Sequence, residues 1–288
     1  MNWVCIDGEF VPGEEARISV WDHGFLYGDG IFETMRAYSG KVLGLEEHLA
    51  RLRQGAELLR LEVREKDTEL VRLLNETIKR NDLADAYIRL TYSRGSGPIG
   101  LDPALCPKAT MVIMAKPPAG DDKVYREGIG LGISPVRRNH PEALTPAVKS
   151  VNFLNNILAK IWAKENNYAE ALLLSQDGWV SETTVSNIFF VRGGKVFTPA
   201  LGVGILPGVT RRFVLEVIRT MGLNLEEGFY STADLAGAEE IFLTNSGSEL
   251  IPVSSLDGKP VGSGKPGRLT QEIHAAFKKF IDISKKIT

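Results

Sequence analysis

One lysine near the middle of the chain lies in a context that suits covalent chemistry. Pro146 predicts a loop or extended segment just before Lys149, and the apolar spacing from Leu154 to Ile161 predicts a helix soon after it. A lysine held partly out of water at such a junction can present a neutral amine, which forms a Schiff base with an aldehyde. Most lysines at loop-to-helix junctions are solvated caps, so this context alone leaves both roles open.

Three further motifs follow Lys149 within about a hundred residues, and they strengthen the chemical role. They are a strand-like stretch that contains Glu182, a Pro-Gly turn before a helix, and an Asn-Ser-Gly turn; their ranges are 180–191, 204–212 and 242–253. In this order they resemble the fold-type IV pyridoxal-phosphate enzymes, a family of branched-chain amino acid aminotransferases, D-amino acid aminotransferases and aminodeoxychorismate lyases. The resemblance runs from about Asp22 to Val253.

The composition is that of an ordinary globular protein. The chain has 288 residues, of which 43% are apolar, and its 34 basic and 36 acidic residues give a net charge of −2. This balance indicates neither a nucleic-acid nor a membrane partner, and the apolar runs are too short for a membrane span. Cys5, Cys106 and the four histidines show no metal-ligand spacing, so we expect reduced thiols, no metal and a cytoplasmic location.

The order of apolar and turn-forming residues predicts two α/β domains. The Pro, Gly and Asp cluster after Lys116 marks the best boundary, giving an N-terminal domain 1–117, a linker 118–127 and a C-terminal domain 128–288 that carries Lys149. The first domain is expected to begin with a hairpin over Val4–Val11 and a strand over Arg17–Val20. The resemblance implies a mixed α/β fold with the cofactor site in the interdomain cleft.

The resemblance also assigns residues to the cofactor, pyridoxal 5′-phosphate. Lys149 would form the Schiff base and Glu182 would hold the proton of the pyridine nitrogen, although Glu182 by itself is only an acid at a turn. Arg51, which precedes the inward-facing Leu52 on a predicted helix, matches the family's phosphate-binding arginine. The remaining expected cofactor contacts are Val209, Thr210, Ser246 and Gly247.

Substrate contacts follow from the same resemblance. Tyr27 and Phe32 belong to a glycine-rich stretch, and Tyr87 and Arg89 share one face of a predicted strand. These four residues would line the substrate site, with Gly247 facing the substrate carboxylate. The implied reaction is ping-pong transfer of an amino group from L-leucine, L-isoleucine or L-valine to 2-oxoglutarate, as in branched-chain amino acid biosynthesis, by a homodimer or larger homo-oligomer.

Some residues depart from the branched-chain pattern and keep other activities open. Phe153 replaces a usual tyrosine, and Thr34 and Thr183 follow glutamates where glycine is usual. A D-amino acid aminotransferase usually has an Arg-x-His pair, which Pro98-Ile99-Gly100 lacks. An aminodeoxychorismate lyase of 4-aminobenzoate synthesis fits about equally well at several positions, and a silent binding protein on the same scaffold is a non-enzymatic alternative.

Overall fold

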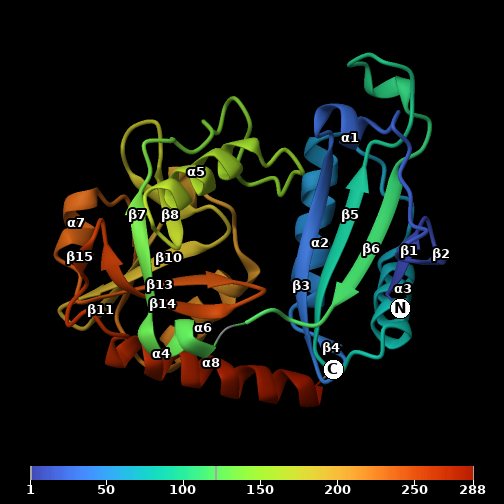
Figure 1. The fold of residues 1–288 in the computed structure, drawn as a ribbon. Helices are drawn as coiled ribbons and strands as arrows, with labels where there is room; N and C mark the ends of the chain where they lie inside the picture. Colours follow the sequence, from blue (N-terminus) through green and yellow to red (C-terminus); the bar gives the residue numbers. More distant parts are fainter. Residues whose placement is uncertain (1, 121, 288) are drawn as a thin grey trace. The chain divides into compact units, whose positions relative to one another are not determined.

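The computed structural model describes residues 2–120 and 122–287. Met1, Asp121 and Thr288, which fall at the ends and in the linker of the predicted domains, lie outside the described residues. The chain divides into two compact units (Figure 1). The first consists of residues 2–119, 148–153 and 287, and the second of residues 120, 122–147 and 154–286.

The first unit is built on a six-stranded antiparallel sheet with the order β2-β1-β6-β5-β3-β4. Its strands are β1 (Trp3–Ile6), β2 (Glu9–Pro12), β3 (Gly30–Tyr38), β4 (Lys41–Val42), β5 (Ala86–Ser93) and β6 (Thr110–Lys116). Its helices are α1 (His23–Tyr27), α2 (Leu45–Leu58), α3 (Asp67–Arg80) and the short 3₁₀ helix Pro103–Leu105.

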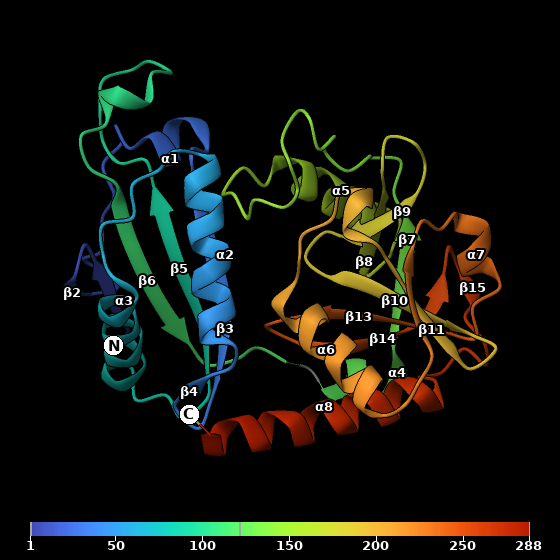
Figure 2. The ribbon, with the colours of Figure 1, turned by 180° about the vertical axis from the view of Figure 1, so that it is seen from behind.

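Helices α2 and α3 cover one face of this sheet, which Figure 2 shows from the helix side. Helix α2 packs on β3, and α3 packs on β6 and β1. Leu52 and Leu70 of these helices are buried in one core with Ile88 of β5. Side chains of a strand alternate between faces, so Tyr87 and Arg89 point to the opposite face. The sheet thus separates a packed side from a side that carries polar residues.

The predicted hairpin is confirmed, but the predicted strand over Arg17–Val20 is wrong. β1 and β2 pair across Asp7 and Gly8, which both have positive φ angles of 50° and 90°, as a tight hairpin turn requires. Residues 17–20 lie in a turn and loop and are exposed. The alternating pattern alone is insufficient there, because a strand also needs a neighbour to accept its hydrogen bonds.

The second unit contains a nine-stranded mixed sheet. The order is β12-β11-β10-β13-β14-β7-β8-β9, with β15 paired to β14. The strands are β7 (Ile129–Ile133), β8 (Glu170–Leu174), β9 (Val180–Thr183), β10 (Asn187–Arg192), β11 (Lys195–Pro199), β12 (Leu225–Gly228), β13 (Glu240–Asn245), β14 (Glu249–Leu256) and β15 (Lys259–Pro260). The helices are α4 (Asp122–Glu127), α5 (Leu154–Glu165), the 3₁₀ helix Leu201–Val203, α6 (Val209–Thr220), α7 (Thr232–Ala236) and α8 (Arg268–Ile287).

Two inner strands of this sheet, β8 and β10, are buried on both faces. β8 and β10 read as nearly continuous apolar runs, and Phe189 on β10 stacks on Phe242 of β13 with ring centroids 4.9 Å apart. Helix α5 packs on β8, and α6 packs on β12 and β13. The ends of β9 and β13 and the start of α6 carry the polar residues expected at the cofactor.

Residues 148–153 belong to the first unit although the chain on both sides of them belongs to the second. The backbone N–H of Phe32 donates to the carbonyl oxygen of Lys149 (2.9 Å), and the N–H of Val151 donates to the carbonyl oxygen of Gly30 (2.9 Å). These bonds fix the segment along the start of β3. The division inferred from sequence, with Lys149 in the second domain, assigns this segment differently, because hydrogen bonds between distant residues leave no mark on local composition.

Candidate active site

Lys149 is held in place by the pairing of its segment with β3. Its Nζ lies 4.5 Å from the centroid of the Phe32 ring, and the lysine is half-buried. Gly30 makes the close approach possible, since a Cβ there would lie 2.5 Å from the carbonyl oxygen of Tyr92 and 3.3 Å from Val151. The Lys149 amine is thus held beside an aromatic ring by the pairing of its segment with β3, which suits a reaction with an aldehyde.

Arg51 is buried, as its place next to Leu52 predicted, and it pairs with a glutamate that sequence reasoning missed. Its Nε and Nη2 donate to the two carboxylate oxygens of Glu33, each at 2.7 Å. His48 Nδ1 lies 2.6 Å from the same carboxylate, and since an ionised carboxylate only accepts, that nitrogen carries the proton. The sequence does carry a signal for this pair: Glu33 is an acidic residue within a largely apolar strand, and an acid that is buried needs a cation beside it.

Glu33, which pairs with Arg51, and His48, which bonds Glu33, both have shifted pKa values. Burial by itself would raise the pKa of Glu33, but the charge and hydrogen bonds of Arg51, helped by His48, lower it to about 2. Burial lowers the pKa of His48, against the opposing attraction of Glu33. Arg51 is therefore anchored beside an anionic carboxylate, and its contact with a phosphate remains a prediction.

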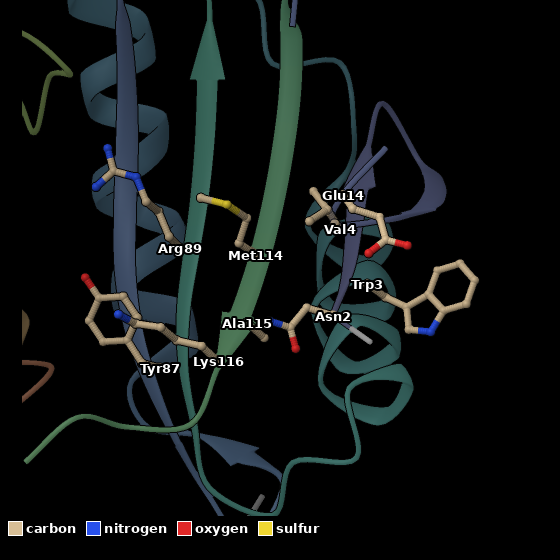
Figure 3. A pocket seen from close by; sticks show the side chains of 10 residues that line it. Asn2, Trp3, Val4, Glu14, Tyr87, Arg89, Met114, Ala115 and Lys116 are labelled. Atoms are coloured by element: carbon tan, nitrogen blue, oxygen red, sulfur yellow. The ribbon is translucent and has the colours of Figure 1, made fainter. Parts of the chain in front are cut away.

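Tyr87 and Arg89 line one pocket on the sheet face opposite α2 and α3 (Figure 3). The pocket has a volume of about 610 Å³, and Met114 is also in its wall. The guanidinium carbon of Arg89 lies 3.7 Å from the centroid of the Phe32 ring, and burial lowers the arginine's pKa. Among the described residues no carboxylate forms an ion pair with Arg89, so this cation can receive an anionic group.

Two other aromatic residues of the predicted site have different surroundings. The rings of Phe153 and Phe32 pack edge to face with their centroids 5.3 Å apart. The phenylalanine that replaces the usual tyrosine therefore makes an apolar contact. The hydroxyl of Tyr27 accepts a hydrogen bond from the N–H of Gly100 at 3.0 Å, so this tyrosine ties the glycine-rich loop to α1. Its contact with a substrate stays a prediction.

Glu182 is the last but one residue of β9 in the second unit, and it accepts three hydrogen bonds. Arg138 Nε donates to Oε1 at 2.8 Å, while the N–H of Leu206 (3.0 Å) and the Nδ2 of Asn187 (3.4 Å) donate to Oε2. The carboxylate is 5% exposed. Sequence reasoning found Glu182 but missed Arg138 and Asn187, which lie in a loop and a neighbouring strand.

The threonines after Glu182 bond within the second unit. Thr183 Oγ1 donates to the carbonyl oxygen of Ser186 (3.2 Å) and accepts from its N–H (3.1 Å), closing the turn. Thr184 Oγ1 donates to the buried Glu170 at 2.7 Å. The hydroxyl of Thr183, which stands where glycine is usual, therefore stabilises the turn after Glu182, and the hydroxyl of Thr184 ties this turn to β8.

Three of the predicted phosphate contacts, Val209, Thr210 and Ser246, lie at or beside the start of α6, whereas Arg51 lies on α2 in the first unit. Val209 and Thr210 form the first turn of this helix, whose initial N–H groups have no intrahelical acceptor, and Thr210 Oγ1 lies 3.4 Å from Ser246 Oγ. In the adjacent turn, the N–H of Gly247 donates to Asn245 Oδ1 at 2.9 Å. The structure brings Val209, Thr210 and Ser246 together, and an amide contact from Gly247 to a ligand remains a prediction.

Each unit by itself carries groups that pyridoxal phosphate needs. A half-buried amine lies beside aromatic rings, a buried carboxylate has one of its roughly four lone-pair positions left, and a helix start with hydroxyls suits an anion. Among the described residues there is no cluster of metal-ligating side chains. None of the helices in residues 2–120 and 122–287 is long and apolar enough to cross a membrane.

Comparison with known proteins places the chain in a family. Residues 30–256 match the amino-transferase class IV family, and the chain belongs to it. A Methanocaldococcus jannaschii protein, named provisionally as a branched-chain-amino-acid aminotransferase, is 40% identical over 278 residues, covering 96% of this chain and 95% of its own. The aminodeoxychorismate lyase of Bacillus subtilis is 34% identical over 281 residues, covering 96% and 94%.

A solved structure is also similar. The T.th. branched-chain amino acid aminotransferase, in complex with N-(5′-phosphopyridoxyl)-L-glutamate, superposes with a TM-score of 0.91 at 30% identity, covering 96% of this chain and 93% of the other. The predicted fold-type IV architecture, the resemblance to branched-chain aminotransferases and the cofactor pyridoxal phosphate are thereby confirmed. The protein is a pyridoxal-phosphate-dependent transaminase.

Proposed function

We propose that this transaminase transfers the amino group of L-leucine, L-isoleucine or L-valine to 2-oxoglutarate. The observation that carries the proposal is the stacking of Arg89 on Phe32, 3.7 Å from the ring centroid, beside Tyr87. Aromatic walls suit an aliphatic side chain, whereas a partly buried guanidinium suits the distal carboxylate of 2-oxoglutarate. One site of this kind accepts both substrates of a ping-pong reaction. The glutamate adduct bound by the similar T.th. enzyme supports the same acceptor.

Each predicted cofactor residue has one task in this proposal. When bound, pyridoxal phosphate supplies an aldehyde for the amine and a ring that accepts the electrons released at the substrate Cα. Lys149 Nζ would hold the cofactor through its aldehyde carbon and would carry the proton at the substrate Cα. Glu182 would accept the hydrogen bond of the protonated ring nitrogen.

The anionic groups of the cofactor and the substrate would be bound by side-chain and backbone donors. Arg51, Val209, Thr210 and Ser246 would bind the phosphate, with the helix start contributing oriented N–H groups. Gly247 would meet the substrate carboxylate, which requires its N–H to exchange Asn245 Oδ1 for the ligand. Tyr27, Phe32 and Tyr87 would enclose the substrate side chain.

We also propose a homodimer in a cytoplasmic location. Helix α5 carries an apolar stripe with the spacing of a helix–helix contact, and its members Leu154, Ile157, Leu158 and Ile161 are 47–62% exposed. A second copy of the chain would cover such a surface. Cys5 and Cys106 are free thiols, which suits a reducing compartment.

The test is a half-reaction with each candidate amino donor. Purified protein is mixed separately with L-leucine, D-alanine and aminodeoxychorismate, and the cofactor absorbance is followed together with released pyruvate. We expect L-leucine to convert the cofactor. Conversion only by D-alanine, or pyruvate only from aminodeoxychorismate, would contradict the proposal and assign the protein to that activity.

The 34% identity with an aminodeoxychorismate lyase makes that activity the second candidate. Arg89→Met separates the two, because the proposed acceptor needs the guanidinium. We expect the KM for 2-oxoglutarate to rise about 10-fold or more while the L-leucine half-reaction changes little. Lys116→Met, which removes another cation of the same pocket, is the matched control.

A further inference from the structure

Arg138 is a buried arginine whose side chain meets the carboxylate of Glu182. It follows β7 in a loop, is 9% exposed, and donates from Nε to Glu182 Oε1 at 2.8 Å. A buried arginine is costly to desolvate and is stabilised by paired charge, so this contact is the main electrostatic partnership in its surroundings. Neither the sequence motifs nor the proposed roles of the cofactor residues include it.

Both the backbone and the side chain of Arg138 are held by hydrogen bonds. The backbone N–H of Arg138 donates to the carbonyl oxygen of Leu174 (2.9 Å), and its carbonyl oxygen accepts from Gln176 (3.1 Å). Its Nη1 donates to Asn155 Oδ1 at 3.2 Å, in the first turn of α5. The end of β8 therefore holds the backbone of Arg138, and the start of α5 and Glu182 hold its guanidinium.

The arrangement leaves one position on the carboxylate for another donor. The N–H of Leu206 and the amide of Asn187 both donate to Oε2, whereas Oε1 receives only Arg138 among the hydrogen bonds described above. A carboxylate offers about four lone-pair positions, so the remaining one lies on the oxygen that Arg138 touches. A ring N–H at that position would share its acceptor oxygen with the guanidinium.

We propose that Arg138 is a positioning residue for the electron-accepting ring: it orients Glu182 Oε1 toward the ring nitrogen and keeps the shared proton on that nitrogen. The inference rests on the role proposed for Glu182. The positive guanidinium favours the state in which the carboxylate is negative and the ring nitrogen carries the proton. Arg138 acts through Glu182 and does not itself touch the cofactor.

The test compares two cofactors in full-length protein stripped of cofactor and reconstituted. One is pyridoxal phosphate, and the other is its analogue with CH in place of the ring nitrogen, which cannot offer the N–H. The wild type should bind pyridoxal phosphate more tightly than the analogue. The ratio of the dissociation constant of the analogue to that of pyridoxal phosphate measures this preference. Arg138→Met should reduce this ratio about 10-fold. Arg138→Lys, which keeps the positive charge but lacks the planar guanidinium, should reduce it less.

The neighbouring Arg137 gives a matched control, because its side chain is exposed; Arg137→Met should leave the ratio unchanged. Equal weakening of both cofactors by Arg138→Met would overturn the proposal and leave Arg138 a purely structural residue. A wild type that binds both cofactors equally would overturn the role of Glu182 as well, so the two failures are distinguishable.

A second pair of variants covers the case in which Arg138→Met does not fold, as judged by circular dichroism. Asn155→Ala removes the Nη1 partner but keeps the Arg138–Glu182 pair, and we expect it to reduce the ratio about 2-fold. Arg138→Lys completes the series. An unchanged ratio in both variants would overturn the proposal.

Discussion

Each unit buries a glutamate against an arginine, and the two pairs are built differently. In the first unit Arg51 places Nε and Nη2 on the two oxygens of Glu33 at 2.7 Å, with His48 at 2.6 Å. In the second unit, Arg138 contacts Glu182 through Nε alone. The other two donors to Glu182, the N–H of Leu206 and the Nδ2 of Asn187, lie at 3.0 and 3.4 Å. The bidentate fork is the stronger geometry.

This difference separates a glutamate whose two oxygens are both tied to its arginine from a glutamate that can still receive a ligand. Glu33 has 0% exposure and both of its oxygens are tied to one guanidinium, so its side chain has little freedom. Glu182 is 5% exposed and one of its oxygens receives a single donor. The same two residue types therefore have different tasks, which five variants or conditions can test.

The largest effect is expected for Lys149→Ala, which leaves both pairs intact. Turnover should fall at least about 1,000-fold, because the amine that binds the cofactor and moves the proton is lost. Steady-state kinetics and the absorbance of bound cofactor measure this. Lys164→Ala, on the exposed part of α5, is the control, and near-normal turnover of Lys149→Ala would contradict the role of Lys149.

Glu182→Gln should lower turnover about 100-fold, because a neutral amide stabilises the protonated ring poorly. The melting temperature should also fall, because Arg138 loses its counter-charge, but by less than in Glu33→Gln, since Arg138 touches Glu182 through Nε alone and the Gln carbonyl oxygen can still accept hydrogen bonds. A loss of stability as large as in Glu33→Gln would make this pair structural, like that of Glu33, and would remove the contrast.

Glu33→Gln should instead destabilise the fold by about 3 kcal/mol, because it leaves Arg51 buried without its counter-charge. Urea denaturation measures the free energy of unfolding. Glu69 and Arg72 form a similar two-bond pair on the exposed face of α3, and Glu69→Gln is expected to change stability very little. Equal effects of the two variants would show that burial does not decide the strength of the pair.

The pH dependence of stability should report the same pair. The pKa of Glu33 falls from 4.5 to about 2 on folding, so the unfolded chain takes up the proton first. The stabilisation is present above about pH 4.5 and is lost as the pH falls toward 2, by about 3 kcal/mol in total. The lowered pKa of His48 adds a loss that begins below pH 6.5. Glu33→Gln should flatten the acid part of this profile, and an unchanged profile would contradict the assignment.

The smallest effect is expected for Thr184→Val, near Glu182 but outside its pair. The variant removes the donor to the buried Glu170, and the free energy of unfolding should fall by about 1 kcal/mol. Thr184→Ser keeps the hydroxyl and should be close to the wild type. Equal stability of both variants would show that this hydrogen bond contributes nothing measurable.

Local patterns predicted much of the fold. The apolar spacing from Leu45 to Leu59 corresponds to α2, and the alternation from Ala86 to Tyr92 corresponds to β5. The strand predicted over the exposed segment Arg17–Val20 was wrong, because an alternating pattern does not supply a neighbouring strand to pair with. The buried setting of Arg51 was predicted from its place beside Leu52, but its partner Glu33 was not, because a strand and the next helix meet only after folding.

The sequence by itself determined the residue types of the chemistry and their order: a lysine, then a glutamate, then two turns rich in small and polar residues. Tertiary structure decided which side chains meet, placing Lys149 along β3 and Arg138 against Glu182. The reason is physical. Propensity and periodicity act over a few residues, whereas the partner of a buried charge is chosen by packing between segments far apart in the chain.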